Sequence, residues 1–183
     1  MSVLGRAALF MALVGAVYVV VMSLASRRPG RRAWEQSAER GVYAVFAFTS
    51  LAIVTMWAAL LTDSFDLRNV AEYSSTTLGP GYKLTALWGS QAGSLLLWAW
   101  ILSGYSAIVV YLNRARNRQL MPVVMAVLMV IAVFFLGILS FVTSPFETLA
   151  SAPAEGRGLN PLLQNVYMQI HPPLLYLGYV GMS

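Results

Sequence analysis

The sequence predicts an all-α fold: a polytopic membrane helix bundle with four complete transmembrane helices, the start of a fifth, and the N-terminus outside. Three observations lead to this prediction. Hydrophobic residues make up 58% of the 183 residues and charged residues only 10%, which is unusual for a soluble domain. The charges gather in clusters, and the apolar runs between them are about 20 residues long, enough to cross a bilayer. Arginines fill alternate gaps between those runs, which sets the orientation.

Four apolar runs have the length of a membrane span, and a fifth begins near the end of the sequence. Polar residues interrupt the first part of the third run, so residues 94–112 are its cleanest portion. The fifth run reaches residue 183 without a stop signal, so residues 1–183 are expected to be the N-terminal membrane domain of a longer or split protein. The runs are residues 3–25, 41–61, 84–112, 120–142 and 172 onward.

The distribution of basic residues predicts which segments face the cytoplasm. Eight of the twelve basic residues lie between the first and second runs or between the third and fourth. Short cytoplasmic loops are enriched in Lys and Arg, so segments of about 26–40 and 113–119 are predicted to be cytoplasmic. The longer segments, about 62–83 and 144–170, carry five of the seven acidic residues and are predicted to face outward.

Composition excludes several kinds of site and partner. The sequence has no cysteine and one histidine, so it forms no disulfide and cannot complete a zinc site by itself. The net charge of +5 is explained by topology. Since no basic face carries interleaved aromatic residues, no nucleic-acid partner is predicted. Membrane lipid is the expected surrounding, and the arginines of residues 27–32 suit anionic headgroups.

The only histidine, His171, lies between an amide-rich segment and an apolar one. Pro172 and Pro173 follow it, and proline suits the first turn of a helix because its missing N–H has no intrahelical partner there. A residue before proline also tends to avoid the α region. We therefore expect a helix over residues 174–181, with His171 at or just before its start.

Three roles for His171 are compatible with the residues alone. It is a hydrogen-bonded structural residue, a proton relay in a transporter or channel, or an axial ligand of haem iron. Ionisable residues in membrane segments are scarce and often functional, and imidazole is a common ligand for metals, including haem iron. Met168, Leu174, Leu175 and Tyr176 are expected around the ring, and the amides of Gln164, Asn165 and Gln169 are candidates to orient it.

A second informative stretch, Trp88 to Trp100, lies at the mouth of the third run. Gly89 and Gly93 allow backbone or a flat ligand to approach closely. Trp88 and Trp98 supply large aromatic faces, with indole donors suited to a membrane interface. Interface anchoring and helix packing explain the same residues without a ligand, so both interpretations stay open at this point.

These two stretches resemble the N-terminal part of the CcmF-type haem lyases of bacterial cytochrome c maturation, a family with a paralogue in nitrite-reductase assembly. The resemblance is carried by Trp88-Gly-x-x-x-Gly-Ser-Leu-Leu-Leu-Trp98 and by Asn160-Pro-Leu-Leu-Gln-Asn leading to His171-Pro-Pro-Leu-Leu-Tyr-Leu-Gly-Tyr-Val-Gly181. Thr143-Ser-Pro-Phe146 also resembles a family segment. The likeness extends from about residue 63 to the end, and the first two runs agree only in hydropathy.

The sequence departs from the family pattern in two ways. Ser90, Gln91 and Ala92 stand where many members have Gly-His-Glu. The family's tryptophan-rich haem-presenting domain, the two histidines flanking that domain and a second membrane histidine would all lie beyond residue 183. The resemblance therefore gives residues 1–183 one of four expected haem ligands, His171.

The resemblance implies a multi-pass protein of the bacterial inner membrane that helps transfer haem to apocytochrome c. His171 would be an axial ligand of a membrane b-type haem, and Trp88, Gly89, Gly93 and Trp98 would form a haem-side surface. The implied partners are the C-terminal half of the lyase, a periplasmic haem chaperone, and apocytochrome c with its thiol-handling partner. A transporter or channel subunit with His171 as proton relay and a cofactor-free structural membrane protein are the alternatives.

Overall fold

A computed structural model describes residues 1–27, 32–114 and 116–182, and this part of the chain is helical, as predicted. Its one β-type feature is an isolated bridge between Leu67 and Thr148. The long helices are α1 (Ser2–Ser26), α2 (Arg32–Leu61), α5 (Gln91–Asn113) and α6 (Met121–Phe141), and α7 (Val166–Gly181) ends the fold. The short elements are α3 (Arg68–Tyr73), α4 (Pro80–Thr85), η1 (Ala86–Gly89) and η2 (Pro161–Leu163).

The four long helices are the four predicted spans, and each is long and apolar enough to cross a membrane. The ends of α1 and α6 fall within one residue of the predicted runs. By contrast, α2 begins at Arg32, so residues 32–40 of the predicted 26–40 loop are helical. Glu35 lies in its first turn, where an acidic side chain interacts favourably with the helix dipole.

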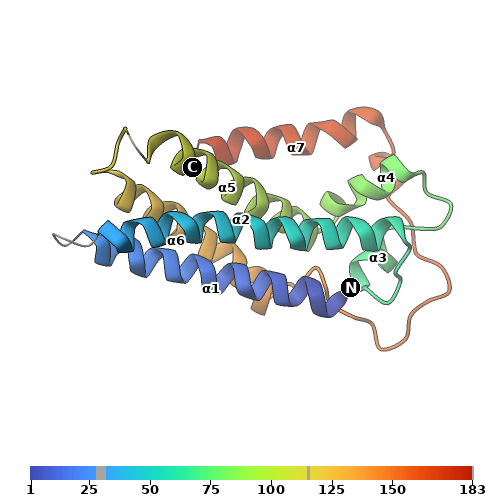
Figure 1. Cartoon of the computed structure of the whole chain (residues 1–183). Coiled ribbons are helices and arrows are strands. Elements are labelled where there is room, and N and C mark those ends of the chain that lie inside the picture. The colour runs from blue at the N-terminus through green and yellow to red at the C-terminus, as the bar shows by residue number, and fades with distance from the viewer. Residues whose placement is uncertain (28–31, 115, 183) are drawn as a thin grey trace.

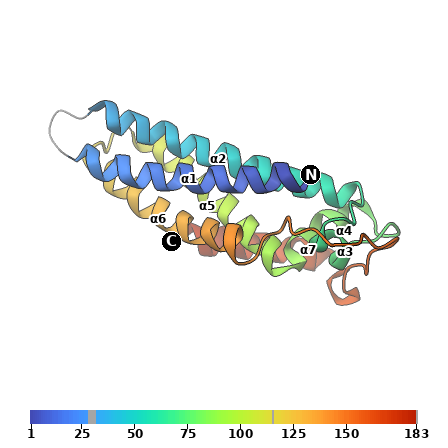
Figure 2. The ribbon, with the colours of Figure 1, turned by 90° about the horizontal axis from the view of Figure 1, so that it is seen from below.

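The bundle is built on close helix contacts (Figures 1 and 2). α1 packs against α2 and α6, and α5 packs against the same two helices. Ala8, Ala12 and Ala16 line the buried side of α1. Gly41 of α2 faces Val19 so closely that a Cβ atom at Gly41 would overlap the valine side chain. Small residues permit this approach, which supplies the van der Waals contact that holds membrane helices together.

Hydrogen bonds between α2 and α5 lie inside the bundle. The Thr49 and Ser103 hydroxyl oxygens are 2.7 Å apart, and both residues are fully buried. Nearby, the Trp100 indole Nε1 donates to the Ser50 hydroxyl at 2.9 Å. In a membrane, such bonds replace those that water would otherwise make, and they fix the register of the two helices.

One end of the bundle, which we call the loop end, carries residues 62–90 and 142–165; the opposite, arginine end carries Arg27, Arg32, Arg114 and Arg118. A segment of the loop end, residues 147–158, forms what we call the strap because its backbone is bonded along residues 66–74. Its amides donate to carbonyls of the facing segment, from Leu149 to Asp66, from Arg157 to Ala71 and from Gly158 to Ser74. The two long segments therefore form one ordered layer.

Phe146 fastens this layer to the first helix. Its side chain is fully buried, and a Cβ atom at Gly5 would overlap its ring. The neighbouring Arg6 donates from Nε to the Phe146 carbonyl at 3.0 Å. A second tie, 2.6 Å from Lys83 Nζ to Asp63 Oδ1, joins α4 to the end of α2.

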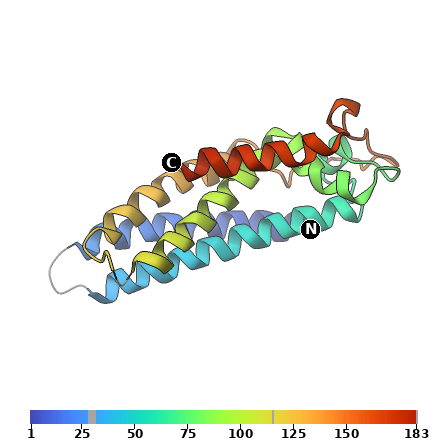
Figure 3. The same ribbon diagram turned by 90° about the horizontal axis from the view of Figure 1, so that it is seen from above.

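The last helix lies along one side of the bundle, beside α5 and on the opposite side from α1 (Figures 1 and 3). Val180 is the one buried residue of α7. The Tyr105 hydroxyl donates to the Leu177 carbonyl at 3.0 Å and fixes the C-terminal half of α7 to α5. Most of the α7 surface therefore contacts no other part of the described structure.

Candidate functional site

The helix that carries His171 begins at Val166, eight residues before the predicted start at Leu174. Asn165 explains the difference, because its side-chain oxygen accepts from the Tyr167 amide at 3.0 Å and caps the helix. His171 is thus a helical residue, and the prediction that it precedes the helix was wrong. Pro172 and Pro173 lie inside α7.

The two prolines change the backbone around His171. Proline has no N–H group, so the carbonyls of Met168 and Gln169 lack the donor that a helix normally supplies four residues later. Two peptide carbonyls next to His171 are therefore left without their usual intrahelical bonds. The local sequence places these acceptors within one turn of the imidazole.

His171 lies on a face of α7 that is turned away from the bundle. It borders a hollow of about 480 Å³ that is lined by α7 residues, Tyr167, Met168, Ile170, His171 and Leu174. These residues lie on one side of a helix by their three- and four-residue spacing. Apart from His171 the lining is apolar and aromatic, which suits a large flat apolar ligand.

The opposite face of α7 contacts the bundle. Gln169, Tyr176 and Val180 follow one another at seven and four residues, which places them on one side of the helix. Val180 is buried, and Tyr176 lines a different hollow together with residues of α5 and α6. His171 is five residues from Tyr176, about 140° around the helix.

The predicted surroundings of His171 are partly confirmed. Met168 and Leu174 line the same hollow, whereas Tyr176 lies on the other face of α7. Tyr167 and Ile170 were missed, although a helix starting at Val166 would have placed both beside His171.

The amides proposed to orient the His171 ring have other partners. Gln164 donates to the Leu159 carbonyl at 2.8 Å, and Asn165 is the cap of α7. Gln169 lies on the bundle-facing side of the helix, near Gly81 of α4. Gln164 and Asn165 therefore build the turn that leads into α7, and Gln169 lies beside α4.

The Trp88 stretch forms a tight turn at the start of α5. Ser90 caps this helix by accepting from the Gly93 amide at 2.9 Å. A Cβ atom at Gly93 would overlap the Leu87 carbonyl oxygen. The close approach predicted at Gly93 is thus real, but the approaching group is the backbone of this chain itself.

Gly89 is likewise approached by residues of this chain. A Cβ atom there would lie 3.2 Å from Leu159 and 3.6 Å from Tyr73. Leu159 belongs to the segment that leads to α7, so the two motif-bearing stretches meet at Gly89. Trp88 is half-buried against the core beside it.

Trp98 lies further along α5 and contacts Phe135 of α6 edge to face, with ring centroids 4.4 Å apart. It lines a hollow of about 390 Å³ with Ser94, Leu95, Phe135 and Tyr176. Its indole Nε1 is buried and has no acceptor among the residues that the structure describes.

The predicted site residues thus form two neighbouring surfaces. His171 belongs to the free face of α7, and Trp98 belongs to the hollow between α5, α6 and α7. Trp88, Gly89 and Gly93 build the turn next to both. Within the described ranges, no group of three His, Asp or Glu side chains is placed to hold a metal ion, so His171 stands alone there as a candidate metal ligand.

Comparisons with known proteins agree with the resemblance seen in the sequence. The family model described as "Cytochrome C assembly protein" matches residues 88–183. A "Cytochrome c-type biogenesis protein CcmF" of Pseudomonas fluorescens is 39% identical over 98% of this chain and 27% of its own length. The CcmF protein of Escherichia coli K12 is 34% identical over 100% of this chain and 28% of its own length.

A solved structure gives the same result in three dimensions. A "Cytochrome c Heme Lyase CcmF" matches with a TM-score of 0.84 and 29% identity, over 99% of this chain and 28% of that chain. A "Cytochrome c-type biogenesis protein NrfE" of Haemophilus influenzae is 38% identical over 74% of this chain. The chain spans about a quarter of the length of the CcmF relatives it matches.

Proposed function

Because the chain belongs to the cytochrome c assembly protein family, we propose that it is the N-terminal membrane part of a haem lyase and that His171 is an axial ligand of a b-type haem. The observation that carries this proposal is the placement of His171 on a free, apolar face of α7. A histidine with a purely structural role would be expected to bond within the bundle instead. The lining of Tyr167, Met168 and Leu174 suits the hydrocarbon surface of a porphyrin.

Axial ligation requires a second contributor. The chain has one histidine and no cysteine, and haem iron held by two histidines needs one from elsewhere. The free face of α7 leaves room for membrane helices of the remaining lyase, which would supply that second ligand. When bound, the haem would supply redox chemistry, and His171 would hold the iron.

We further propose that Trp98, whose hollow lies on the bundle-facing side of α7, contributes to the haem-side surface. Its indole nitrogen is buried without a partner among the described residues, and the residue lines the hollow shared by α5, α6 and α7. We assign Trp98 to the haem-side surface. Trp88, Gly89 and Gly93 act on that surface indirectly, by shaping the turn before α5.

The proposed location is the bacterial inner membrane, with the N-terminus outside. The four long helices make the chain a multi-pass membrane protein. The helix ends that carry Arg27, Arg32 and Arg114 lie at one end of the bundle, and the strap and the short helices lie at the other (Figure 1). With the arginine end in the cytoplasm, the loop end faces the periplasm.

This orientation gives the loop end its proposed partners, which are a periplasmic haem chaperone and apocytochrome c with its thiol-handling protein. The remainder of the lyase would cover α7.

Reporter fusions after Arg32 and Arg116 should behave as cytoplasmic, and fusions after Glu72 and Glu155 as periplasmic. A periplasmic signal at Arg32 would contradict the orientation.

The direct test of ligation is substitution of His171 in membranes that also contain the rest of the lyase. His171→Ala should convert the six-coordinate b haem to five-coordinate haem or release it, and cytochrome c yield should fall sharply. His171→Gly should behave alike, but added imidazole should restore part of the six-coordinate spectrum. Leu174→Ala, on the same face, is the matched control and should keep the ligation spectrum.

Expression of residues 1–183 alone gives a second test. A single axial ligand should not hold low-spin haem, so the purified protein should be largely colourless. A full-occupancy bis-histidine spectrum from this chain alone, or wild-type b-haem absorbance in His171→Ala, would refute the proposed ligation. A proton relay would leave the haem spectrum unchanged in every variant.

A further inference from the structure

A hollow of about 440 Å³ opens between α1 and α6 at the loop end. Arg6, Leu9 and Phe10 line it from α1, and Leu139, Ser140 and Phe141 line it from α6. Helix α1, which lines this hollow, lies on the opposite side of the bundle from α7 (Figure 1). Neither the candidate haem face nor the Trp98 hollow uses any of these residues.

One half of this hollow is polar and has unused hydrogen-bonding capacity. Arg6 donates from Nε to the Phe146 carbonyl, and a guanidinium has four further N–H donors on its two terminal nitrogens. Arg6 makes no ion pair with any residue the structure describes. The buried Ser140 hydroxyl also lacks a partner within the described ranges.

An acidic residue, Glu147, borders the same hollow, and it shares the guanidinium of Arg68 with Glu72. Arg68 Nη1 lies 3.3 Å from a carboxylate oxygen of Glu147. Arg6 is the one cation among the described residues that line this hollow, and its guanidinium forms no ion pair with any of them. A guanidinium at the rim of a membrane-spanning helix favours an anionic group with several acceptor oxygens.

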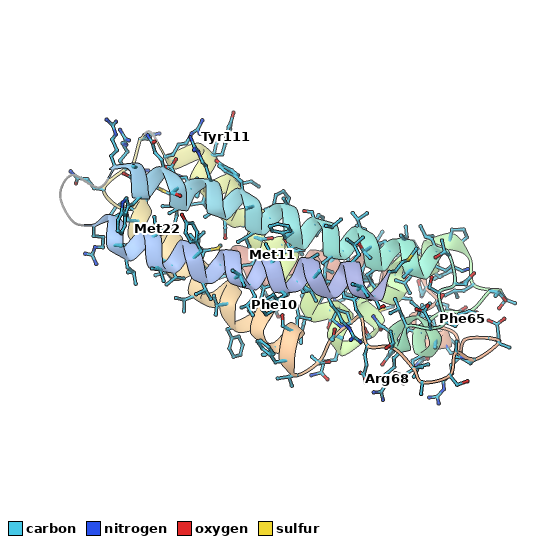
Figure 4. All side chains as sticks on the ribbon, turned by 60° about the horizontal axis from the view of Figure 1, so that its bottom comes forward. Phe10, Met11, Met22, Phe65, Arg68 and Tyr111 are labelled. Carbon is cyan, nitrogen blue, oxygen red and sulfur yellow. The ribbon has the colours of Figure 1, made fainter. Side chains whose placement is uncertain are left out.

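The other half of the hollow is apolar and open to the surroundings of the bundle. Phe10 is 51% exposed, Phe141 74% and Val142 80%. Figure 4 shows Phe10 projecting from α1 where α6 runs beside it. Exposed aromatic and aliphatic side chains on a membrane-spanning helix contact lipid chains, so the hollow joins a cationic rim to a lipid-facing surface.

The depth of Arg6 agrees with the headgroup level of a bilayer. It is the fifth residue of α1, about 6 Å along the axis from the first. Side chains of a helix lean toward its N-terminus, which brings the guanidinium still closer to the water interface. A long basic side chain near a helix end normally takes this position.

We propose that this hollow binds an anionic membrane phospholipid, with the phosphodiester at Arg6 and Ser140 and one acyl chain along Phe10 and Phe141. The leaflet is the one at the N-terminal end of α1. A soluble phosphate would use only the polar half. A zwitterionic lipid would add a cationic group beside Arg6 and bind more weakly.

The test measures binding of fluorescent phosphatidylglycerol to the purified 183-residue chain in detergent micelles, with the matched phosphatidylcholine as comparison. Arg6→Gln should weaken phosphatidylglycerol binding roughly tenfold, as expected for loss of a charge-assisted contact. Arg116→Gln, at the arginine end, is the matched control and should bind as wild type. Equal loss in both variants would show that only total charge matters and would overturn the proposal.

A second variant keeps the Arg6–Phe146 hydrogen bond intact. Ser140→Phe fills the hollow from the α6 side, and it should reduce binding to the level of Arg6→Gln while circular dichroism shows unchanged helix content. Unchanged binding in Ser140→Phe would place the lipid elsewhere. Competition by millimolar inorganic phosphate would show a site for a free anion and would also contradict the lipid assignment.

Discussion

The four-helix bundle and α7 differ in how much of their surface is buried by other residues of this chain. In the bundle, every long helix has a buried side formed by its neighbours, and Leu9, Ile53, Leu96 and Met129 are almost fully inaccessible. In α7, Val180 alone is buried. Both regions contain many apolar residues, and these stabilise the fold in the bundle but remain exposed in α7.

This difference indicates that α7 is the part of the chain that lipid or further protein covers. A helix that is apolar all round and covered on one side only is completed by lipid or by further protein. His171, the proposed haem ligand, lies in the uncovered region. The bundle is thus a scaffold that fixes α7, and the site belongs to α7 and whatever covers it.

The largest expected contrast comes from leucine truncation in the two regions. Leu96 in α5 is 0% exposed and Leu174 in α7 is 59% exposed. Leu96→Ala should lower the free energy of unfolding of this chain by about 2–5 kcal/mol, and Leu174→Ala by less than about 0.5 kcal/mol. Reversible unfolding in mixed micelles measures both, and equal effects would mean that α7 packs like the bundle.

Glycine substitution should give the next largest contrast. Gly93→Ala places a methyl group against the Leu87 carbonyl, which belongs to the backbone and cannot rotate away. Overpacking of this kind costs about 1–3 kcal/mol. Gly178→Ala in α7 meets nothing within 4 Å and should leave the unfolding curve unchanged. A destabilised Gly178→Ala chain would show that α7 has a partner surface within residues 1–183.

Hydrogen bonds sharpen the comparison at smaller magnitude. Tyr105→Phe removes the hydrogen bond to the Leu177 carbonyl. The free energy that holds α7 against α5 should fall by about 0.6 kcal/mol, the average for such bonds in membranes. Hydrogen exchange should then rise in residues 166–181 alone. Ser103→Ala, which loses the bond to Thr49, should act on α2 and α5 instead. Increased exchange throughout the chain in Tyr105→Phe would contradict independent docking of α7.

The smallest effect is expected at the strap. Glu155 accepts from the Thr76 hydroxyl at 2.6 Å and from its amide at 2.8 Å, and these bonds hold the pKa of Glu155 below its usual value. A lowered folded-state pKa means that the carboxylate stabilises the strap above about pH 4.3, the ordinary glutamate value. This stabilisation is lost as the pH falls through the lower, folded value.

Hydrogen exchange of residues 70–78, normalised to the intrinsic rate at each pH, should therefore increase on acidification in the wild type. Glu155→Gln should remove that dependence while leaving α7 unaffected. The idea fails if Glu155→Gln and the wild type respond to acid alike.

The membrane spans could be predicted because their signal is local. Residues 3–25 and 120–142 match α1 and α6 almost residue for residue, since apolar length and flanking charge decide them. The start of α2 was less accessible to prediction because Arg32 to Arg40 are polar yet helical. Hydropathy marks where a helix meets lipid, and this helix continues beyond that point.

The surroundings of His171 were harder to predict because the start of α7 is set by the capping residue Asn165, whereas the two prolines suggested a later start. Asn165 starts α7 early, and that shift decides which residues share a face with His171. The contacts of Phe146 and of the strap join residues far apart in sequence. The contact at Gly93 depends on the close approach of one backbone carbonyl, that of Leu87. No periodic pattern in the sequence encodes them.

The packing of Phe146 against α1 also constrains the order in which the protein folds. The Arg6–Phe146 hydrogen bond joins residues 140 positions apart, so its two halves leave the ribosome at very different times. The pocket at Gly5 stays unfilled while three further helices are synthesised and inserted. Closure of the loop end is therefore a late folding event with high contact order, and α7, which follows Phe146 in the chain, docks onto a bundle that is closing at the same time.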